Sequence, residues 1–441
     1  MKIFFFTILI LPFLYNCSFD NKTGIWTGDE KLTKKEKSLS NLKPVFKDNQ
    51  NEFLEKDFSN KEDLSFGKVG NNLSWTQQYQ NNANHIKRSN FSNIGSIEKF
   101  SKISRYNINN NILYKNDKLY YSDVKGNIGI YSLINNKELF KFNFYKKKFK
   151  NIDKKINIIL KNNLIIAADN FGYIYCINYV EKKLIWAKNY LIPFRSNIKI
   201  LDNFLFIIDE KNKVIKVDLK TGNKLDEIYT QPAKTVSSFN SNLSIDNSNN
   251  VLALTTNGTL YSLNLLNKKV INWIANFKNE DEVTFQAKPI IVVDNDILIS
   301  TKDKISVIST TGKKKWEIDL KITVNPIVSG KYILLVTDKN YLMFIDKDTG
   351  KIMYSQNIIK MLKNDTDKNY GKKIKKFEHL LLINNKVLII SESSYFIELT
   401  LGKRISISSV RKNPFQIISD IIFFKSNLLL VSDTKRIYKI N

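Results

Sequence analysis

The chain has 441 residues, of which 43% are hydrophobic and 12% aromatic, which is enough apolar material for a large core. Its 69 Lys and Arg residues against 42 Asp and Glu residues give a net charge of +27, and its two cysteines and two histidines exclude a disulfide framework and leave zinc sites unsupported. The basic residues are mostly lysines spread through turns, so the charge indicates either a solvated surface or an anionic partner. No recognisable nucleic-acid module accompanies the charge, and we expect no nucleic-acid partner.

The first seventeen residues have the pattern of an export signal. Met1-Lys2 gives a minimal positive start, and the apolar run from Ile3 to Leu14 is too short to span a bilayer as a helix. The run ends in Leu14-Tyr15-Asn16-Cys17, which resembles a bacterial lipoprotein signal with Leu three residues before the lipidated Cys. Asn16 departs from that pattern, which prefers Gly, Ala or Ser, so a plain secretory signal and an uncleaved anchor remain alternatives. We predict a signal peptide over residues 1–16 and lipidation of Cys17.

The next stretch, residues 17–72, is polar and charged and has no sustained hydrophobic period. It offers little apolar surface, so the sequence predicts a tether. From Leu73 to His85 the composition becomes aromatic and amide-rich, and we place the start of a folded domain, residues 73–441, at this change.

A unit of four short strands recurs through this domain. One copy contains Ile290–Val293, Ile297–Thr301, Ile305–Ser309 and Trp316–Leu320, and Thr311-Gly312 reverses the chain before its last strand. The third strand of the unit recurs at Ile128–Leu133, Tyr173–Asn178, Val214–Leu219, Leu260–Asn264, Ile305–Ser309, Tyr341–Asp346, Tyr395–Leu399 and Arg436–Ile440. A period of roughly 40–45 residues with four strands per repeat is typical of propellers. The sequence therefore predicts an all-β fold, a β-propeller of about eight four-stranded blades.

The two ends of the domain complement each other. The last repeat, from about Phe415 to Asn441, ends at its third strand, whereas Ser96–Ile103 forms a lone strand before the first full repeat. We predict that this N-terminal strand supplies the missing fourth strand of the last blade, because such closure removes exposed sheet edges. Phe100 would then occupy the position that Trp316 has in its own blade.

Aromatic residues after the reversals carry a family resemblance. Trp186 in KKLIW, Trp316 in TGKKKW and Tyr354 in TGKIMY resemble the Gly-x-x-x-Trp repeat ending of pyrroloquinoline-quinone enzymes and their non-enzymatic relatives. The resemblance implies that a set of aromatic residues docks between blades as structural groups, namely Trp186, Trp273, Trp316, Tyr354 and Phe100.

Three features together narrow the resemblance: the lipoprotein-like start, the SWTQQYQNNANHI stretch before the closing strand, and about eight divergent blades. In combination they resemble the BamB family, lipoprotein subunits of the outer-membrane β-barrel assembly machinery. The resemblance implies a scaffold that has no cofactor and is lipid-anchored at the periplasmic face of the outer membrane. Its expected partners are the POTRA domains of the barrel-forming subunit and other assembly lipoproteins.

The resemblance also implies a partner site. The family docks through a loop with a hydrophobic-x-hydrophobic-Arg pattern, which here is Ile192-Pro193-Phe194-Arg195. An exposed Phe beside an Arg fits interface chemistry, so Ile192, Phe194 and Arg195 are the predicted partner-binding residues. The alternative is that Ile192 and Phe194 fill space between blades and Arg195 is a loop charge. The family's acidic pair in the next blade has no counterpart between Val236 and Ile245, before Asp246.

The sequence offers no catalytic constellation. Quinone-dependent dehydrogenases of similar fold need adjacent cysteines, whereas Cys176 stands alone in the strand YIYCIN and is expected to be a buried thiol. His85 and His379 lie in unrelated contexts. Asp346–Gly350 begins like a calcium loop but has Asn357 where the last acid should stand, so we predict a hairpin turn. We expect no enzymatic activity and no metal; the alternative function is a periplasmic or surface propeller that binds a glycan or small ligand in its central funnel.

Overall fold

The computed structural model describes residues 18–19, 26–27, 55–58, 64–70, 73–91, 94–145, 149, 151–232, 240–266, 270–279, 282, 284–366, 370–402 and 404–441. The chain divides into two compact units, Met1–Leu54 and Glu55–Asn441. In the first unit the described residues form β1 (Ser18–Phe19) and β2 (Trp26–Thr27), which pair in antiparallel fashion. Cys17 lies outside the described residues, so its lipidation stays a prediction.

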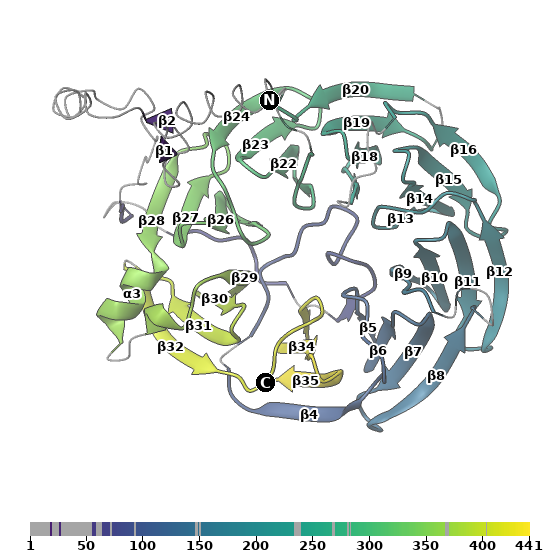
Figure 1. The fold of residues 1–441 in the computed structure, drawn as a ribbon, viewed down its shortest axis with the longest axis horizontal. Coiled ribbons are helices and arrows are strands. Elements are labelled where there is room, and N and C mark those ends of the chain that lie inside the picture. The colour runs from purple at the N-terminus through teal and green to yellow at the C-terminus, as the bar shows by residue number, and fades with distance from the viewer. Residues whose placement is uncertain are drawn as a thin grey trace, which may run out of the picture. The chain divides into compact units, whose positions relative to one another are not determined.

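The second unit is a ring of eight four-stranded antiparallel blades, as predicted (Figure 1). Blades 1 to 4 contain, from the centre outward, β5 (Leu113–Lys115), β6 (Lys118–Ser122), β7 (Asn127–Ser132) and β8 (Lys137–Asn143); β9 (Ile156–Lys161), β10 (Leu164–Asp169), β11 (Tyr173–Asn178) and β12 (Lys183–Asn189); β13 (Lys199–Leu201), β14 (Phe204–Ile208), β15 (Val214–Asp218) and β16 (Lys224–Ile228); β17 (Asn242–Ile245), β18 (Val251–Leu254), β19 (Thr259–Asn264) and β20 (Val270–Asn276).

The remaining blades follow the same order, apart from the last. Blades 5 to 8 contain β21 (Ile291–Val293), β22 (Asp296–Ser300), β23 (Lys304–Ser309) and β24 (Lys314–Asp319); β25 (Ile327–Ser329), β26 (Tyr332–Val336), β27 (Tyr341–Asp346) and β28 (Ile352–Asn357); β29 (Phe377–Ile383), β30 (Lys386–Ser391), β31 (Tyr395–Thr400) and β32 (Ser406–Lys412); β33 (Ile422–Phe424), β34 (Asn427–Val431), β35 (Arg436–Ile440) and β4 (Ile97–Lys102). The short helices α3 (Ile358–Asp365) and η2 (Tyr370–Lys372) lie between β28 and β29. No helix among the described residues has the length and apolar character needed to cross a membrane.

Burial explains why the inner strands are the easiest to recognise in the sequence. All five residues of β22 and β26 are buried, because each blade is covered on both faces by its neighbours. The outermost strands alternate instead, and in β24 exposed and half-buried residues follow each other along the strand. The inner strands therefore appear as continuous apolar runs and the outer strands as mixed ones.

The predicted closure by an N-terminal strand is confirmed. β4 pairs with β35, with Ile97 opposite Ile440 and Lys102 opposite Arg436, so the two ends of the domain share one blade (Figure 1). Phe100 is 5% exposed and belongs to the core. Its register differs from the prediction. The pairing of β4 with β35 is irregular near the start of β35, between Arg436 and Tyr438, whereas Trp316 stands beside an irregularity near the end of β23, between Val307 and Ile308.

A segment before β4, residues 73–91, crosses the centre of the ring and is called the crossing segment (Figure 1). It begins with β3 (Ser74–Trp75), which pairs with β5 of blade 1. Its amide side chains then bond to carbonyls in or next to the inner strands: Asn82 donates to Ile200 O (2.9 Å), and Asn84 donates to Leu243 O (2.8 Å) and to Ile290 O (2.9 Å), just before β21. The segment thus links the inner ends of several blades.

The propeller unit begins earlier than the predicted boundary at Leu73. Phe58 is 8% exposed and stacks on Tyr354 of β28 with ring centroids 5.1 Å apart, and Phe66 packs against Tyr332 at 5.6 Å. Lys56 exchanges two backbone hydrogen bonds with Ser355. These contacts place the described residues from Glu55 onward with the propeller rather than with a free tether. The aromatic side chains of this otherwise polar stretch pack on the apolar surface of blade 6.

Candidate partner-binding loop

The loop of residues 190–198, between β12 and β13, contains the predicted partner-binding residues, and its backbone is fixed by hydrogen bonds. Tyr190 N donates to Gly172 O (2.8 Å), and Pro193 O accepts from Glu210 N (2.8 Å). A Cβ on Gly172 would lie 2.7 Å from Ile192 O, so glycine is needed there for the loop to approach so closely. The loop is therefore a preformed surface rather than a flexible connection.

The expected exposure of Phe194 is wrong. Its side chain is 7% exposed and packs against Tyr190 with ring centroids 5.6 Å apart, inside the core between blades 2 and 3. Its backbone forms a bridge to Asp209, and Ile108, Ile322 and Ile417 form the same kind of bridge in other blades. Phe194 thus occupies a recurrent packing position, which agrees with the alternative that it fills space between blades.

The exposed apolar residue of the loop is Leu191. Its side chain is 83% exposed, and its φ of +68° lies in the left-handed region that bulky residues rarely adopt. Ile192 is half-buried beside it. The loop therefore presents an apolar side chain to solvent one residue before the predicted motif.

Arg195 is paired within the chain. Its Nε donates to Glu210 Oε1 (3.1 Å), and its Nη2 contacts the same oxygen, with both side chains 22% exposed. Asp246, the first acid after the corresponding stretch of the next blade, is also engaged, since its Oδ1 accepts from Ser248 N (2.9 Å) and Asn250 N (2.8 Å). Residues 233–239 of that stretch lie outside the described residues.

Of the five predicted inter-blade aromatics, the three tryptophans contact the next blade. Each of three tryptophans donates its indole N–H to a carbonyl in the turn of the next blade: Trp186 to Leu219 (3.0 Å), Trp273 to Thr310 (2.9 Å) and Trp316 to Lys347 (2.8 Å). Tyr354 lies differently, because its ring packs against Phe58 and its hydroxyl reaches Met361 Sδ of α3 at 3.9 Å. The three indoles thus join neighbouring blades as structural groups.

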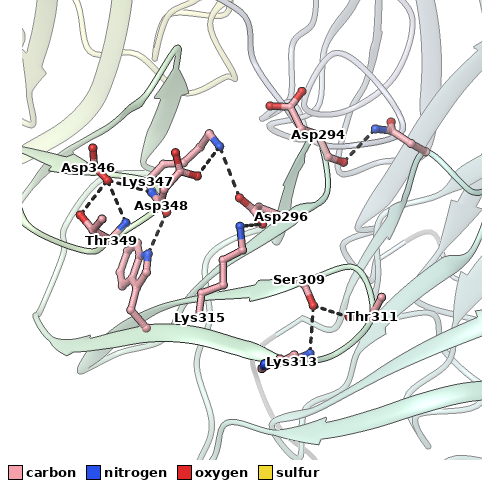
Figure 2. Close-up of polar contacts among 12 residues, drawn as sticks. Asp294, Asp296, Ser309, Thr311, Lys313, Lys315, Asp346, Lys347, Asp348 and Thr349 are labelled. Carbon is pink, nitrogen blue, oxygen red and sulfur yellow. Dashed lines mark hydrogen bonds and ion pairs between the residues drawn. The ribbon is translucent and has the colours of Figure 1, made fainter.

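The joint between blades 5 and 6 shows how the tryptophan position is reinforced. Asp296, at the start of β22, is contacted by Lys315 Nζ (2.6 Å) and Lys347 Nζ (3.5 Å), while Lys347 also bonds to Asp348 Oδ1 (2.9 Å) (Figure 2). The carbonyl of the same Lys347 accepts the Trp316 indole N–H. Ion pairs and indole packing thus fix the same turn.

Comparison with known proteins decides the family. The family model described as outer membrane protein assembly factor BamB matches residues 136–356, half of the 441-residue chain. The chain belongs to this family. No curated protein matches the chain.

Solved structures agree with this BamB-family assignment in fold. BamB from Moraxella catarrhalis superposes with a TM-score of 0.59 at 11% identity, covering 79% of this chain and 98% of that one. Quinohemoprotein alcohol dehydrogenase from Comamonas testosteroni gives a TM-score of 0.61 at 9% identity, covering 82% of this chain and 77% of that one. The computationally designed Ika8 protein gives 0.55 at 8% identity, covering 78% and 98%. These likenesses are to the propeller fold.

The residues considered for catalysis belong to different parts of the propeller unit: Cys176 to β11, His379 to β29 and His85 to the crossing segment. Cys176 is fully buried in β11, where burial raises the pKa of its thiol to about 12, so the nucleophilic thiolate is not formed at neutral pH. Burial lowers the pKa of His379 to about 4, and His85 Nε2 bonds to Val328 O at 2.9 Å. Across the described part of the chain, no three His, Cys, Asp or Glu residues are grouped so as to hold a metal ion.

The segment Asp346–Gly350 forms the turn between β27 and β28. Asp346 Oδ1 accepts from Asp348 N (3.1 Å), Thr349 N (2.9 Å) and Thr349 Oγ1 (2.8 Å), and Gly350 has φ +75° (Figure 2). The carboxylate therefore stabilises its own turn, as in a hairpin reversal.

Sequence reasoning missed Asp420, a buried acid in the connection before β33 that lines a small cavity together with Tyr79 and His379. Ser419 Oγ donates to Asp420 O and accepts from Val431 N, the same arrangement that Ser196 Oγ makes with Asn197 O and Ile208 N. Asp420 thus takes the place that Asn197 has in blade 3. Burial raises the pKa of Asp420 to about 7, and its Oδ2 has no donor within the described ranges. Aligning Ser419-Asp420-Ile421 with Ser196-Asn197-Ile198 would have revealed the acid.

We expect the Asp420→Asn protein to be more stable than wild type at pH 8 and about equally stable at pH 4. The pKa of Asp420 is raised from 3.8 to about 7, so the folded state binds the proton more tightly, and the folded state loses relative stability as pH rises from about 4 through 7. Asn carries no charge and removes this loss. Melting temperatures of both proteins at the two pH values check the prediction; an equal difference at both pH values contradicts it.

Proposed function

We propose that this chain is a non-catalytic scaffold subunit of the outer-membrane β-barrel assembly machinery and that it binds the POTRA domains of the barrel-forming subunit. The observation that carries the proposal is the family match over residues 136–356, because that family is described as an outer membrane protein assembly factor. The fold fits this role. A ring whose blades are linked by the crossing segment offers a rigid surface that a partner can bind with little reorganisation.

The proposed anchor is a lipid on Cys17, which would hold the protein at the periplasmic face of the outer membrane beside the other assembly lipoproteins. The pattern Leu14-Tyr15-Asn16-Cys17 supports it. Stable attachment needs more than one acyl chain, which bacterial lipoproteins provide on a single cysteine. Mass spectrometry of the N-terminal peptide tests this part of the proposal, and an unmodified Cys17 contradicts it.

We place the partner surface on the loop of residues 190–198, centred on Leu191 and extending to Ile192 and Arg195. Leu191 is 83% exposed on a backbone that is already ordered, so little conformational entropy is lost when a partner covers it. Phe194 supports the loop from below through its contact with Tyr190. Arg195 pairs with Glu210, which forms no other ion pair among the described residues, and Arg195 marks the edge of this surface.

We expect Leu191→Asn to weaken capture of the barrel-forming subunit at least tenfold, about 1.4 kcal/mol. The change removes the exposed apolar side chain, while Asn suits the left-handed backbone at φ +68°. Because the side chain is not part of the core, the melting temperature should stay the same. Chemical cross-linking in envelope membranes, followed by purification of the full-length chain, measures the capture.

The matched control is Ile134→Asn, since Ile134 is 77% exposed in the turn between β7 and β8 of blade 1. It should capture the barrel-forming subunit as wild type does. Equal capture by the Leu191→Asn protein would move the partner surface elsewhere on the propeller. Failure of the wild-type chain itself to recover the barrel-forming subunit would contradict the proposed function.

The geometry also bears on the two other functions considered. Likeness to an alcohol dehydrogenase is a likeness of fold, and the buried protonated Cys176 offers no nucleophile. The alternative of a glycan in the central funnel is disfavoured because the crossing segment occupies the centre. A cavity between this segment and blades 6 to 8, lined by Tyr79, His379 and Asp420, has a volume of about 80 Å³, against the ~300 Å³ or more of ordinary ligand pockets.

A further inference from the structure

Exposed apolar side chains are unevenly distributed around the rim of the propeller. The outer strands of blades 5 to 8 have no exposed large apolar side chain among their described residues. Three neighbouring blades, 2 to 4, carry such side chains on their outer strands: Leu184 and Ile185 in β12, Leu225 in β16, and Val270, Ile271 and Ile274 in β20. Figure 1 shows these three strands following one another along the circumference of the ring. Apolar surface that stays exposed over neighbouring elements marks an interaction site.

Within this apolar rim, β20 has an edge without the usual protection. It is the last strand of its sheet, and its outer edge pairs with no other strand of the described residues. Proteins commonly protect such edges with charged side chains, above all Lys. Every other outer strand except β28 contains at least one Lys, whereas β20 has the sequence VINWIAN, without any charge. The edge of β20 is therefore open to pairing with a further strand.

The second uncharged outer strand, β28, shows how such an edge is filled. Lys56 N donates to Ser355 O (2.8 Å), and Ser355 N donates to Lys56 O (2.9 Å), which is an antiparallel bridge to the outer edge of the blade. Phe58 follows in the same short segment and stacks on Tyr354. As a result Ser355 is 1% exposed. The protein thus covers one uncharged edge with an extended piece of its own chain.

The two strands can be aligned residue by residue through their irregularities. Trp273 in β20 and Tyr354 in β28 each stand beside the irregularity in the pairing with the preceding strand, so Ile274 corresponds to Ser355. Because N–H and C=O directions alternate along an antiparallel strand, corresponding residues direct these groups the same way. The N–H and C=O of Ile274 therefore point outward, as those of Ser355 do. Ile274 is nevertheless 56% exposed, against 1% for Ser355.

The outward curvature of the rim decides which kind of partner fits (Figure 1). A second copy would meet it rim against rim, and two convex surfaces touch over a small area, whereas a stable interface buries about 1,200–2,000 Å². Two copies would also each bring a net charge of +27. A flat membrane touches a convex rim over a similarly small area. An extended chain, in contrast, follows the edge of a single strand and needs no flat surface.

We propose that the outer edge of β20 binds an extended, uncharged and apolar segment of another polypeptide, which adds to blade 4 as a further strand. Backbone hydrogen bonds to Ile274 hold the segment, and Val270, Ile271 and Ile274 cover its apolar side chains. Because β20 has no charged side chain, a charge on the bound segment would lose water without gaining a counter-charge. The site is separate from the loop of residues 190–198 and does not depend on the proposed function.

Three synthetic peptides test the proposal on the full-length protein: one of alternating Val and Thr, the same peptide with N-methyl groups on its central residues, and one of alternating Ser and Thr. The first has both N–H donors and apolar side chains, the second lacks the central donors and the third lacks the apolar side chains. Fluorescence anisotropy of labelled peptides measures binding. We expect the Val-Thr peptide to bind at least tenfold more tightly than either of the others. Equal affinity for the first two peptides would overturn the proposal, because binding would then not use backbone hydrogen bonds.

Variants assign the binding to β20. Ile274→Glu introduces the charge that Glu317 has after the tryptophan of β24, and it should weaken binding of the Val-Thr peptide at least tenfold. The matched control is Leu225→Glu, since Leu225 is 52% exposed on β16, an outer strand that already carries charges. It should bind the peptide as wild type does. Both changes affect exposed side chains, so both melting temperatures should stay close to wild type. Unchanged affinity of the Ile274→Glu protein would overturn the proposal.

Two further measurements locate the site and test the other occupants. With a photo-reactive group at the centre of the Val-Thr peptide, we expect mass spectrometry to find cross-links to residues 270–276, and cross-links confined to another blade would overturn the proposal. A wild-type dimer in sedimentation analysis that Ile274→Glu converts to monomers would assign the edge to a second copy instead. Binding to vesicles of phosphatidylethanolamine and phosphatidylglycerol that Ile274→Glu abolishes, with peptide binding unchanged, would assign it to a membrane surface. Either result would overturn the proposal.

Discussion

Replacing residues 96–103 by a Gly-Ser linker of equal length should abolish the cooperative unfolding of the propeller. The replacement removes β4, and with it the pairing to β35 and two buried side chains, Phe100 at 5% and Ile103 at 4% exposure. Truncating side chains of this size costs about 2–5 kcal/mol each, against a total stability of about 5–15 kcal/mol for a domain. The exposed edge of β35 would also be free to pair with other chains.

The matched control is deletion of residues 28–54, which leaves the whole unit from Glu55 intact. This protein should melt cooperatively and close to the wild-type temperature, because those residues belong to the other compact unit. Differential scanning calorimetry and size-exclusion chromatography compare the two. A linker protein that melts like the deletion control would show that closure by β4 does not stabilise the ring.

The ring itself was predictable because its repeat combines two independent signals. Continuous apolar runs mark the inner strands and polar reversals mark their ends, so the predicted third strands Tyr173–Asn178, Tyr341–Asp346 and Arg436–Ile440 coincide with β11, β27 and β35. The closing strand followed from counting strands in the last repeat. Both inferences use local patterns, and the propeller stacks such local units.

The crossing segment and the partner loop could not be predicted in detail because their partners lie far away in the sequence. Asn84 bonds to carbonyls 159 and 206 residues away, and no periodicity in the segment reveals this. Phe194 was predicted to be an interface residue because it matches the family's loop pattern and stands beside Arg195, yet the neighbouring blade covers it. Burial in such connections depends on how two blades pack, which a single repeat does not show.

The same limit applies to Asp420 and to Phe58. An acid in a connection normally indicates a solvated turn, and only the comparison with Asn197 in blade 3 shows that the position faces inward. Phe58 stands in a polar stretch whose composition is typical of a tether, and its stacking on Tyr354 needs the finished blade 6 as a surface. Single residues that pack on an assembled core leave little signal in the sequence around them.

Changes at the contact between Trp316 and Gly350 should also lower the free energy of unfolding strongly. Trp316→Ala should destabilise the protein by about 2–3 kcal/mol, because the half-buried indole loses both its packing and its hydrogen bond to Lys347 O. Gly350→Ala should cost about 2–4 kcal/mol, since Gly350 has φ +75° and a Cβ there would lie 2.7 Å from Trp316 Cδ2. The midpoints of urea unfolding measure both changes.

Combining the two changes separates the contributions of backbone and packing. In the Trp316→Ala background the Cβ introduced by Gly350→Ala no longer meets the indole, so only the cost of the left-handed backbone remains. The double variant should therefore be about 1–2 kcal/mol more stable than the sum of the single effects predicts.

Gly402→Ala is the matched control. Gly402 lies in the reversal of blade 7 and has no positive φ, and the atom nearest to the new Cβ would be 3.7 Å away. That change should be neutral or slightly stabilising. Strict additivity of the Trp316 and Gly350 changes would show that the indole does not hold this turn, and that the ion pairs of Asp296 with Lys315 and Lys347 fix the joint instead.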